Sequence, residues 1–317
     1  MVTLVEGERR SVTGERLYTV KLIPDGERKA IFVFHHGLGE HCGRHIEDLK
    51  AYASRGIEVW TYDAYGHGKS TGVRADYRVP LMVDDLCAVV AEAAAEAPGG
   101  KAFVGGMSLG GLISTTAAMR DQSVVAGLML QAPALGVTLT PVMKVQNAFG
   151  PLLGRLAPRA RLVPAVRPED LNPDPVEVRK YLDDPLNTTG NVRVGSALST
   201  KEGMAICQKL WPTFEAPILA FHGDADRCTD PAFTKGFVDA AKSRDKRFVS
   251  VKGGYHEFLH GPDGPPIKAQ IGDWILERAQ RLAHPEPAPG ATREAAQGDA
   301  HATIEIVAPV TKANAKF

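Results

Sequence analysis

Short apolar runs alternate with amphipathic segments along most of the chain. The apolar runs, bounded by turn residues, predict β-strands within residues 2–34 and at 57–62, 102–104, 127–131, 218–222 and 247–251. Apolar positions at helical spacing predict helices at about 44–55, 81–97, 141–156, 192–210 and 267–282, and one directly after residue 108. Because short apolar strands alternate with helices, we predict an α/β protein with a mostly parallel central sheet and helices on both faces.

The interval from Leu135 to Pro217 is far longer than one crossover helix and its loops require. We therefore interpret residues 135–212 as a cap or lid inserted into a core formed by residues 1–134 and 213–282. The stretch 141–156 is apolar with a basic edge, which favours packing on the core, lining of an apolar pocket and transient contact with a membrane surface. Residues 283–317 are rich in Pro, Ala and Gly, and we expect this tail to be disordered.

Composition narrows the class of protein. Lys and Arg together number 37, as do Asp and Glu, so the formal net charge of +0 gives no electrostatic basis for binding nucleic acid. The four cysteines are scattered without a C-x-x-C pair, which indicates free thiols in a reducing compartment. No stretch approaches the roughly 20 apolar residues of a membrane-spanning helix, and the first residues lack the apolar core of a signal peptide. We expect a soluble, cytoplasmic protein.

The stretch KAFVGGMSLGGLISTTA at residues 101–117 holds the candidate nucleophile. Within it, Gly106-Met107-Ser108-Leu109-Gly110 fits G-x-S-x-G, the sharp turn that exposes a serine between a strand and a helix. Small residues are needed on both sides of such a strained corner. The alternative interpretation is a glycine-rich turn with an incidental serine, so the remaining catalytic groups decide the question.

A serine hydroxyl needs a base, and histidine is the residue expected. His256 follows the last predicted strand through two glycines and is our candidate base. His260 is the alternative, although we expect it to be exposed or structural. His222 and His36 also lie at strand ends, where we expect them to bond backbone groups.

The base needs a carboxylate that fixes its orientation, and in this fold type the order along the chain is serine, acid, histidine. Among Asp224, Asp226 and Asp230, we choose Asp226, because its distance from the strand end lets it turn back toward a histidine. Asp224 is expected to stabilise the turn itself. The expected oxyanion donors are the backbone N–H groups of Leu109 and Leu38.

Other motifs fail on inspection. Gly68-Lys69-Ser70 resembles the end of a phosphate-binding loop, but Asp63 stands where that loop requires glycine. Asn187-Thr188-Thr189 matches a glycosylation acceptor, which we interpret as a plain loop. Cys228 is interpreted as a small packed residue, the alternative being a reactive thiol near the candidate acid. No metal or organic cofactor is implied.

Taken together, the segments HHGLGEH, YDAYGHGKSTGVR, GGMSLGG, ILAFHGDADRCTD and GGYHEFLH resemble the monoacylglycerol lipase family of α/β-hydrolases. The resemblance implies the α/β-hydrolase fold with Ser108 as nucleophile, Asp226 as acid and His256 as base, and Leu38 and Leu109 as oxyanion donors. Met107 is a departure, because the family usually has histidine before the nucleophile. The cap is only loosely similar.

We therefore predict a serine hydrolase that cleaves carboxylic esters of lipids, above all monoacylglycerols, through an acyl-enzyme. A small lipid ester would be its substrate. A lysophospholipase and a general carboxylesterase are alternatives within hydrolysis. An acyltransferase using the same triad, and a non-catalytic receptor on the same fold, are alternatives from other classes.

Overall fold

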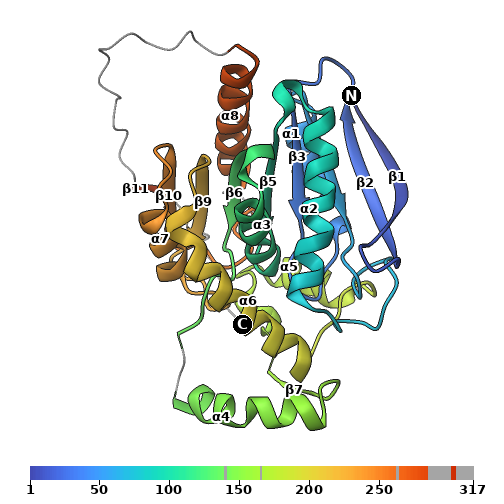
Figure 1. Ribbon diagram of the computed structural model, residues 1–317, viewed down its shortest axis with the longest axis vertical. Coiled ribbons are helices and arrows are strands. Elements are labelled where there is room, and N and C mark those ends of the chain that lie inside the picture. Colours follow the sequence, from blue (N-terminus) through green and yellow to red (C-terminus); the bar gives the residue numbers. More distant parts are fainter. Residues whose placement is uncertain (139–140, 165, 262–263, 285–300, 305–317) are drawn as a thin grey trace, which may run out of the picture.

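A nine-stranded sheet forms the centre of the molecule in the computed structural model, which describes residues 1–138, 141–164, 166–261, 264–284 and 301–304 (Figure 1). The strand order is β1-β2-β4-β3-β5-β6-β9-β10-β11. The strands are β1 (Val2–Arg10), β2 (Arg16–Pro24), β3 (Ala30–His35), β4 (Ile57–Tyr62), β5 (Ala102–Met107), β6 (Val125–Gln131), β9 (Ile218–Gly223), β10 (Lys246–Val251) and β11 (His301–Ile304). β1 pairs antiparallel with β2, as does β2 with β4, and the other neighbours are parallel.

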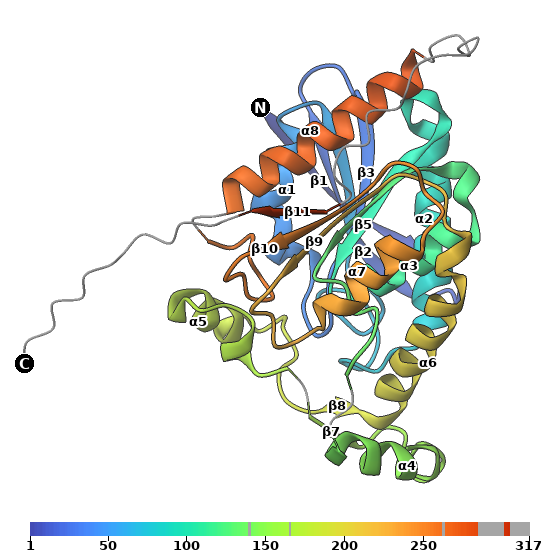
Figure 2. The ribbon, with the colours of Figure 1, turned by 90° about the vertical axis from the view of Figure 1, so that its left-hand side faces the viewer.

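Helices cover both faces of this sheet, as predicted (Figure 2). The helices are α1 (Ile46–Ala53), α2 (Val79–Glu96), α3 (Leu109–Arg120), α4 (Pro141–Leu156), α5 (Pro175–Asp183), α6 (Val194–Leu210), α7 (Pro231–Ala240) and α8 (Gly264–Ala283). Helices α1 and α8 pack on one face, whereas α2, α3 and α7 pack on the other. The predicted strands and most predicted helices are confirmed, while α5 and α7 were not predicted.

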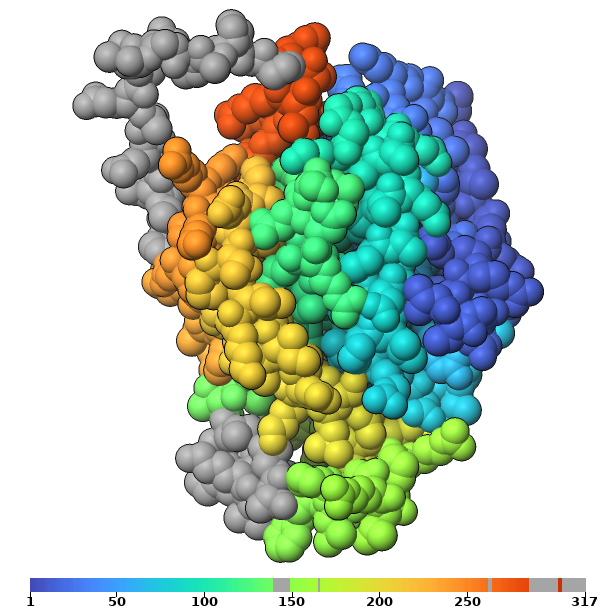
Figure 3. Space-filling view, in the orientation of Figure 1, coloured from blue at the N-terminus to red at the C-terminus, as the bar shows by residue number. Residues whose placement is uncertain are grey.

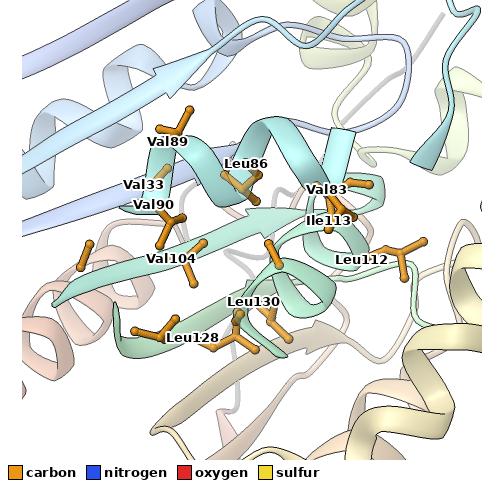
Figure 4. Packing of buried hydrophobic residues seen from close by; sticks show 14 of the residues in the cluster. Val33, Val83, Leu86, Val89, Val90, Val104, Leu112, Ile113, Leu128 and Leu130 are labelled. Atoms are coloured by element: carbon orange, nitrogen blue, oxygen red, sulfur yellow. The ribbon is translucent and has the colours of Figure 1, made fainter. Parts of the chain in front are cut away.

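The two faces of the sheet are built by alternation along fully buried strands. On β3, Ile31 and Val33 point into the core beneath α2 and α3, and Phe32 and Phe34 point into the core beneath α1 and α8. Figure 4 shows the first of these cores, where aliphatic side chains of α2 and α3 interlock with those of β5 and β6. Because both faces are covered, the strands read as continuous apolar runs in the sequence.

The chain between β6 and β9 leaves the sheet and forms the segment interpreted as a cap. It holds α4, α5, α6 and a two-stranded ladder of β7 (Arg161–Val163) and β8 (Val192–Arg193). Helix α6 packs against α2 and α3 of the core, and α4 packs against α6 at the end of the molecule farthest from α8 (Figure 1). The same end is seen as the light-green region at the bottom of Figure 3. The side chains of residues 141–148 lie outside the described residues.

The C-terminal segment differs in one respect from the disordered tail that was expected. Residues 301–304 form β11, which pairs in parallel with β10 at the edge of the sheet. The exposed backbone groups of an edge strand offer hydrogen bonds to any extended segment, so four residues can dock there without a large apolar surface. Most of the remaining tail lies outside the described residues. Among the helices the structure describes, none is both long and apolar enough to cross a bilayer.

Candidate active site

Ser108 occupies the sharp corner between β5 and α3. Its backbone has φ 55° and ψ −121°, a left-handed conformation that few residues other than glycine adopt. The Ser108 N–H donates to the carbonyl of Gln131 at 3.1 Å, which fixes the corner to the neighbouring strand. Its carbonyl accepts from Ala134 N–H at 2.8 Å and from the first turn of α3. The corner is therefore held in place by backbone bonds on both sides.

The glycines around Ser108 are required by close backbone approaches. A Cβ at Gly110 would collide with the carbonyl oxygens of His35 and His36 at the end of β3. A Cβ at Gly106 would lie 2.6 Å from the carbonyl oxygen of His35. The need for side-chain-free neighbours predicted from G-x-S-x-G thus has a direct cause in the contact between α3 and β3.

His256 and Asp226 come together from the loops after β10 and β9. Nδ1 of His256 lies 2.7 Å from Oδ2 of Asp226, and both side chains are almost completely buried. A carboxylate can only accept, so the proton of the neutral imidazole sits on Nδ1. This leaves Nε2 with a free lone pair, the state that a general base requires. Ser108 and His256 line the same cavity.

The electrostatics of this pair favour an ionised acid. Burial would raise the pKa of Asp226, but hydrogen bonds from His222 and His256 outweigh it and hold that pKa well below its usual range. The other oxygen of Asp226 accepts from the N–H groups of Cys228 at 2.6 Å and Thr229 at 3.1 Å. For His256, burial lowers the pKa, yet the hydrogen bond to Asp226 and its negative charge raise the pKa above 6.5 overall.

The loop after β3 brings its backbone against the serine. A Cβ built at Gly37 would lie 3.2 Å from Cβ of Ser108. His36 accepts from Ala64 N–H at Nε2 (3.0 Å), so its Nδ1 carries the proton and donates to the Gly37 carbonyl at 2.8 Å. The expectation that His36 bonds backbone groups is confirmed. Because C=O and N–H point in opposite directions across a trans peptide, this bond also orients the N–H of Leu38.

A buried ionic network holds the loop after β3 in place. Glu40 accepts from Gly37 N–H at 2.5 Å and pairs with Arg44 at 2.6 Å. Arg44 also makes two bonds, of 2.7 and 3.0 Å, to the carboxylate of Glu257, the residue after His256. The pKa of Glu257 is lowered to about 2: burial raises it, but hydrogen bonds and charges from His260 and Arg44 outweigh burial. The sequence analysis missed Glu40, Arg44 and Glu257, because the contact between Arg44 and Glu257 joins segments 213 residues apart.

The alternative candidates take other roles. His260 is mostly buried and lies between Asp48 (3.1 Å) and Glu257 (3.2 Å), so it is structural but not exposed. Asp224 accepts from Gly253 N–H at 2.6 Å and ties the two loops together. Asp230 caps α7 through Ala232 N–H. These groups stay outside the set formed by Asp226 and His256.

The expectation for His222 was wrong. Its ring nitrogens contact side chains rather than backbone groups: Nδ1 lies 2.7 Å from Oγ1 of Thr234, and Nε2 lies 3.1 Å from both Oγ1 of Thr229 and Oδ2 of Asp226. The loop after β9 folds back over its own strand end, which brings Asp226 above His222. The sequence analysis expected Asp226 to turn back toward a histidine, but it did not identify His222 as a second partner of that carboxylate.

A cavity of about 760 Å³ opens in front of the serine. Its walls are mainly apolar and come from the core and from the inserted segment, with Leu38, Phe149, Leu152, Leu171, Leu198 and Met204 among them. Its polar lining residues include Glu40, Glu257 and Tyr181, all three in contact with Arg44, and Thr188, whose N–H donates to the Gly39 carbonyl. A large apolar cavity with a few polar groups is typical of a small-molecule site.

All four cysteines are free thiols, as expected. Cys228 borders the cavity, and its Sγ contacts the carbonyl of Asp170 at 3.4 Å. Burial and the charge of Asp226 raise the pKa of Cys228 well above its usual value, which opposes formation of the reactive thiolate. Within the part of the chain that the structure describes, two groups of side chains have metal-ligand spacing, namely His45–Asp48–His260 and Asp226–Cys228–His256. In the first, Asp48 already binds Lys268 at 2.6 Å.

Comparisons with known proteins agree with this geometry. A profile of the family described as serine aminopeptidase, S33, matches residues 26–263. The monoacylglycerol lipase of Mycolicibacterium smegmatis is 29% identical over 267 residues, which cover 84% of this chain and 94% of that protein. The human monoglyceride lipase is 28% identical over 281 residues, covering 86% of this chain and 91% of the human protein.

The crystal structure of the monoacylglycerol lipase from Paleococcus ferrophilus superposes with a TM-score of 0.75 at 29% identity, and the match covers 83% of this chain and 99% of that one. The predicted fold class is thereby confirmed, as is the family resemblance. The matched region contains the turn at Ser108, the strand ends that carry Asp226 and most of the loop that carries His256. The chain therefore belongs to the serine aminopeptidase S33 family and has the α/β-hydrolase fold.

Proposed function

We propose that this protein is a serine hydrolase that cleaves monoacylglycerols to glycerol and fatty acid through an acyl-enzyme. The observation that carries the proposal is the pairing of His256 Nδ1 with Asp226 at 2.7 Å beside the cavity that Ser108 lines. Ser108 is the nucleophile, His256 the base, and Asp226 the acid that orients it. A non-catalytic receptor would need none of these three groups in this arrangement.

In the first half of the reaction, Oγ of Ser108 attacks the ester carbonyl while Nε2 of His256 takes its proton. The negative oxygen of the tetrahedral intermediate is bound by the N–H groups of Leu38 and Leu109. Leu109 is the first residue of α3, so its N–H lies ahead of the first intrahelical hydrogen bonds and is available. The carbon–oxygen bond to glycerol then breaks, and His256 gives its proton to the departing glycerol oxygen.

In the second half, a water molecule replaces glycerol and attacks the acyl-serine ester. His256 accepts a proton from the water, the tetrahedral intermediate forms again, and the proton returns to Oγ of Ser108 as the fatty acid leaves. Asp226 stays ionised throughout and stabilises the imidazolium. No redox step is involved.

The cavity supports a lipid ester as substrate. Its apolar walls can hold an acyl chain, and Glu40 and Arg44 lie beside the loop after β3 that carries Leu38, where the glycerol hydroxyls of a bound monoacylglycerol can reach them. The guanidinium carbon of Arg44 lies 4.9 Å from the ring centre of Tyr181, so this ring is held against the ionic network at the cavity wall. The named relatives are lipases of monoacylglycerols, which supports the same substrate class here.

We further propose transient contact between the cap and a lipid surface. Phe149, Leu152 and Leu162 line the cavity and are also more than half exposed, so this wall joins the cavity to the outside. Leu156, which lies on α4 with Phe149 and Leu152, is 74% exposed and lies outside the cavity. Nearby Arg155, Arg159 and Arg161 supply positive charge toward anionic headgroups.

The deciding experiment labels the purified protein with a fluorophosphonate and measures hydrolysis of monoacylglycerols, lysophospholipids and short-chain esters. We expect labelling at Ser108 and fastest hydrolysis of monoacylglycerols, with both lost in Ser108→Ala. Labelling without hydrolysis of any ester would overturn the proposal. Preference for lysophospholipids or short esters would move the enzyme to another substrate class, and ester products on addition of an alcohol would identify an acyltransferase.

A further inference from the structure

We infer that His222 is a positioning residue that, together with Thr229, holds the carboxylate of Asp226 in place for His256. This inference rests on the proposed function of Ser108, Asp226 and His256. It assigns a second imidazole to the acid, in addition to the imidazole that the reaction uses.

The geometry places two histidines on one carboxylate oxygen. Oδ2 of Asp226 lies 2.7 Å from Nδ1 of His256 and 3.1 Å from Nε2 of His222. The hydroxyl of Thr229 lies 2.9 Å from the same oxygen and 3.1 Å from Nε2 of His222. His222 is completely buried near the end of β9, so its ring has no access to water.

The position of the protons follows from the partners. An unprotonated Nε2 at 3.1 Å from a carboxylate oxygen would place two lone pairs against each other, so the proton of His222 is on Nε2. Nδ1 then accepts from the hydroxyl of Thr234 at 2.7 Å. Thr234 is itself fully buried in α7. The ring is thus clamped between α7 and the loop that carries Asp226.

This clamp has two consequences for catalysis. It restricts the acid to one position, and the position of the acid sets the orientation of His256. It also shares the negative charge of Oδ2 of Asp226 among His222, Thr229 and His256, so the pull on the proton of His256 is weaker than it would be with His256 as the single donor. Loss of His222 should therefore slow the reaction and raise the pH below which His256 is protonated.

Other ionisable groups also face His256, and any change of pH profile must be read against them. They are Asp226, His222 and Cys228 on the β9 side, Glu257 and His260 on its own loop, and Glu40, Arg44 and His45 around the loop after β3. A substitution at His222 keeps all the other groups in place and changes only the contacts that His222 makes. The shift it causes can therefore be assigned to Asp226.

The test compares His222→Leu, which removes the donor, with His222→Gln, which keeps an N–H near the position of Nε2. For His222→Leu we expect a fall of about 10- to 100-fold in kcat/KM and an acid limb displaced by roughly half a pH unit or more to higher pH. For His222→Gln we expect kcat/KM within about threefold of wild type. The low-field proton resonance of the His256–Asp226 bond should move in His222→Leu and be nearly restored in His222→Gln.

Thr229→Val and Thr229→Ser provide a second pair that leaves strand β9 untouched, in case His222→Leu fails to fold. We expect the valine variant to displace the acid limb and the serine variant to restore it. An unchanged acid limb and resonance in His222→Leu and Thr229→Val would overturn the inference. If wild type hydrolyses esters through Ser108 in that case, the proposed function stands without it. If the wild-type protein shows no ester hydrolysis that depends on Ser108, the proposed function itself is refuted.

Discussion

Arg44 and Glu257 form a two-pronged ion pair, with Nη1–Oε1 at 2.7 Å and Nη2–Oε2 at 3.0 Å, between segments 213 residues apart. Both side chains are buried. Through Glu40, Arg44 is bound to the Gly37 N–H; through Glu257, it is bound to the residue next to His256. One guanidinium therefore joins the loop after β3 to the loop that carries His256, the proposed base.

Replacing Arg44 by Met should remove the cation that the buried carboxylates of Glu40 and Glu257 share, which leaves Glu257 beside His260 and Glu40 bound to the Gly37 N–H. We expect the free energy of unfolding to fall by roughly 3–5 kcal/mol and kcat to fall by about 10- to 100-fold as the two loops separate. Denaturant unfolding and kinetics on a short-chain ester would measure both. Arg44→Lys keeps the charge without the two-pronged geometry, so its unfolding free energy and its kcat should lie between those of wild type and Arg44→Met. Wild-type kcat in Arg44→Met would contradict this positioning role.

The pH dependence of kcat/KM should show an acid limb above pH 6.5. His256 must be neutral to accept the proton of Ser108, and Asp226 raises the pKa of His256 above 6.5 despite the opposing effect of burial. Activity should drop about tenfold for each pH unit below that pKa. An uncharged ester is the appropriate substrate, because its own ionisation cannot contribute. A rate that stays level down to pH 4 would exclude His256 as the base.

Gly110→Ala should be costly although it lies in a helix, where alanine is normally favoured. The added Cβ would collide with the carbonyl oxygens at the end of β3, so we expect a loss of roughly 1–3 kcal/mol in unfolding free energy and a large loss of kcat. Gly26→Ala is the matched control, because a Cβ there has open space. Equal stability of the two variants would show that α3 and β3 can separate.

His260 should make stability fall at alkaline pH. Burial lowers its pKa, but hydrogen bonds and charges from Asp48 and Glu257 raise that pKa to about 10. A raised pKa means that the stabilisation is complete below about pH 6.5 and is lost as the pH rises toward 10. Unfolding measured between pH 6.5 and 10 should show this decline, and His260→Gln should show less of it. Equal slopes in the two proteins would indicate that His260 is neutral throughout.

Leu156→Ser should weaken binding to anionic phospholipid vesicles without changing hydrolysis of a dissolved short-chain ester. Leu156 is exposed on α4 and lies outside the cavity, so its apolar side chain is free to contact lipid. Val176→Ser on α5 is the control, since Val176 is also exposed and also lies outside the cavity. Vesicle sedimentation would measure both. Equal binding by the two variants would argue against α4 as the contact.

The sequence could predict the sheet because its inner strands are buried on both faces and therefore appear as unbroken apolar runs. Ser108 was recognisable because a strained corner needs glycines in fixed places, and His256 and Asp226 because each follows such a run. Helix α7 was missed, since its few buried residues (Thr234, Phe237 and Val238) leave only a short apolar pattern.

The network around Arg44 was harder to predict. Charged residues are usually exposed, and nothing in the spacing of Arg44 and Glu257 shows that they meet. The same holds for His222, whose partners become visible only once the loop after β9 has folded back. Contacts between distant loops depend on tertiary geometry, which local patterns do not encode.

The segment between β6 and β9 leaves the sheet at one strand and returns at the neighbouring strand, because β6 and β9 are paired, with Leu128 opposite Ile218. Evolution can therefore lengthen, shorten or exchange that segment without disturbing the strand pairing of the central sheet. Much of the cavity wall comes from the segment, whereas Ser108, Asp226 and His256 follow the ends of β5, β9 and β10. If the segment between β6 and β9 is exchanged between two homologues, the selectivity for acyl-chain length should follow the segment. The three side chains proposed for ester cleavage would remain those of the protein that receives it.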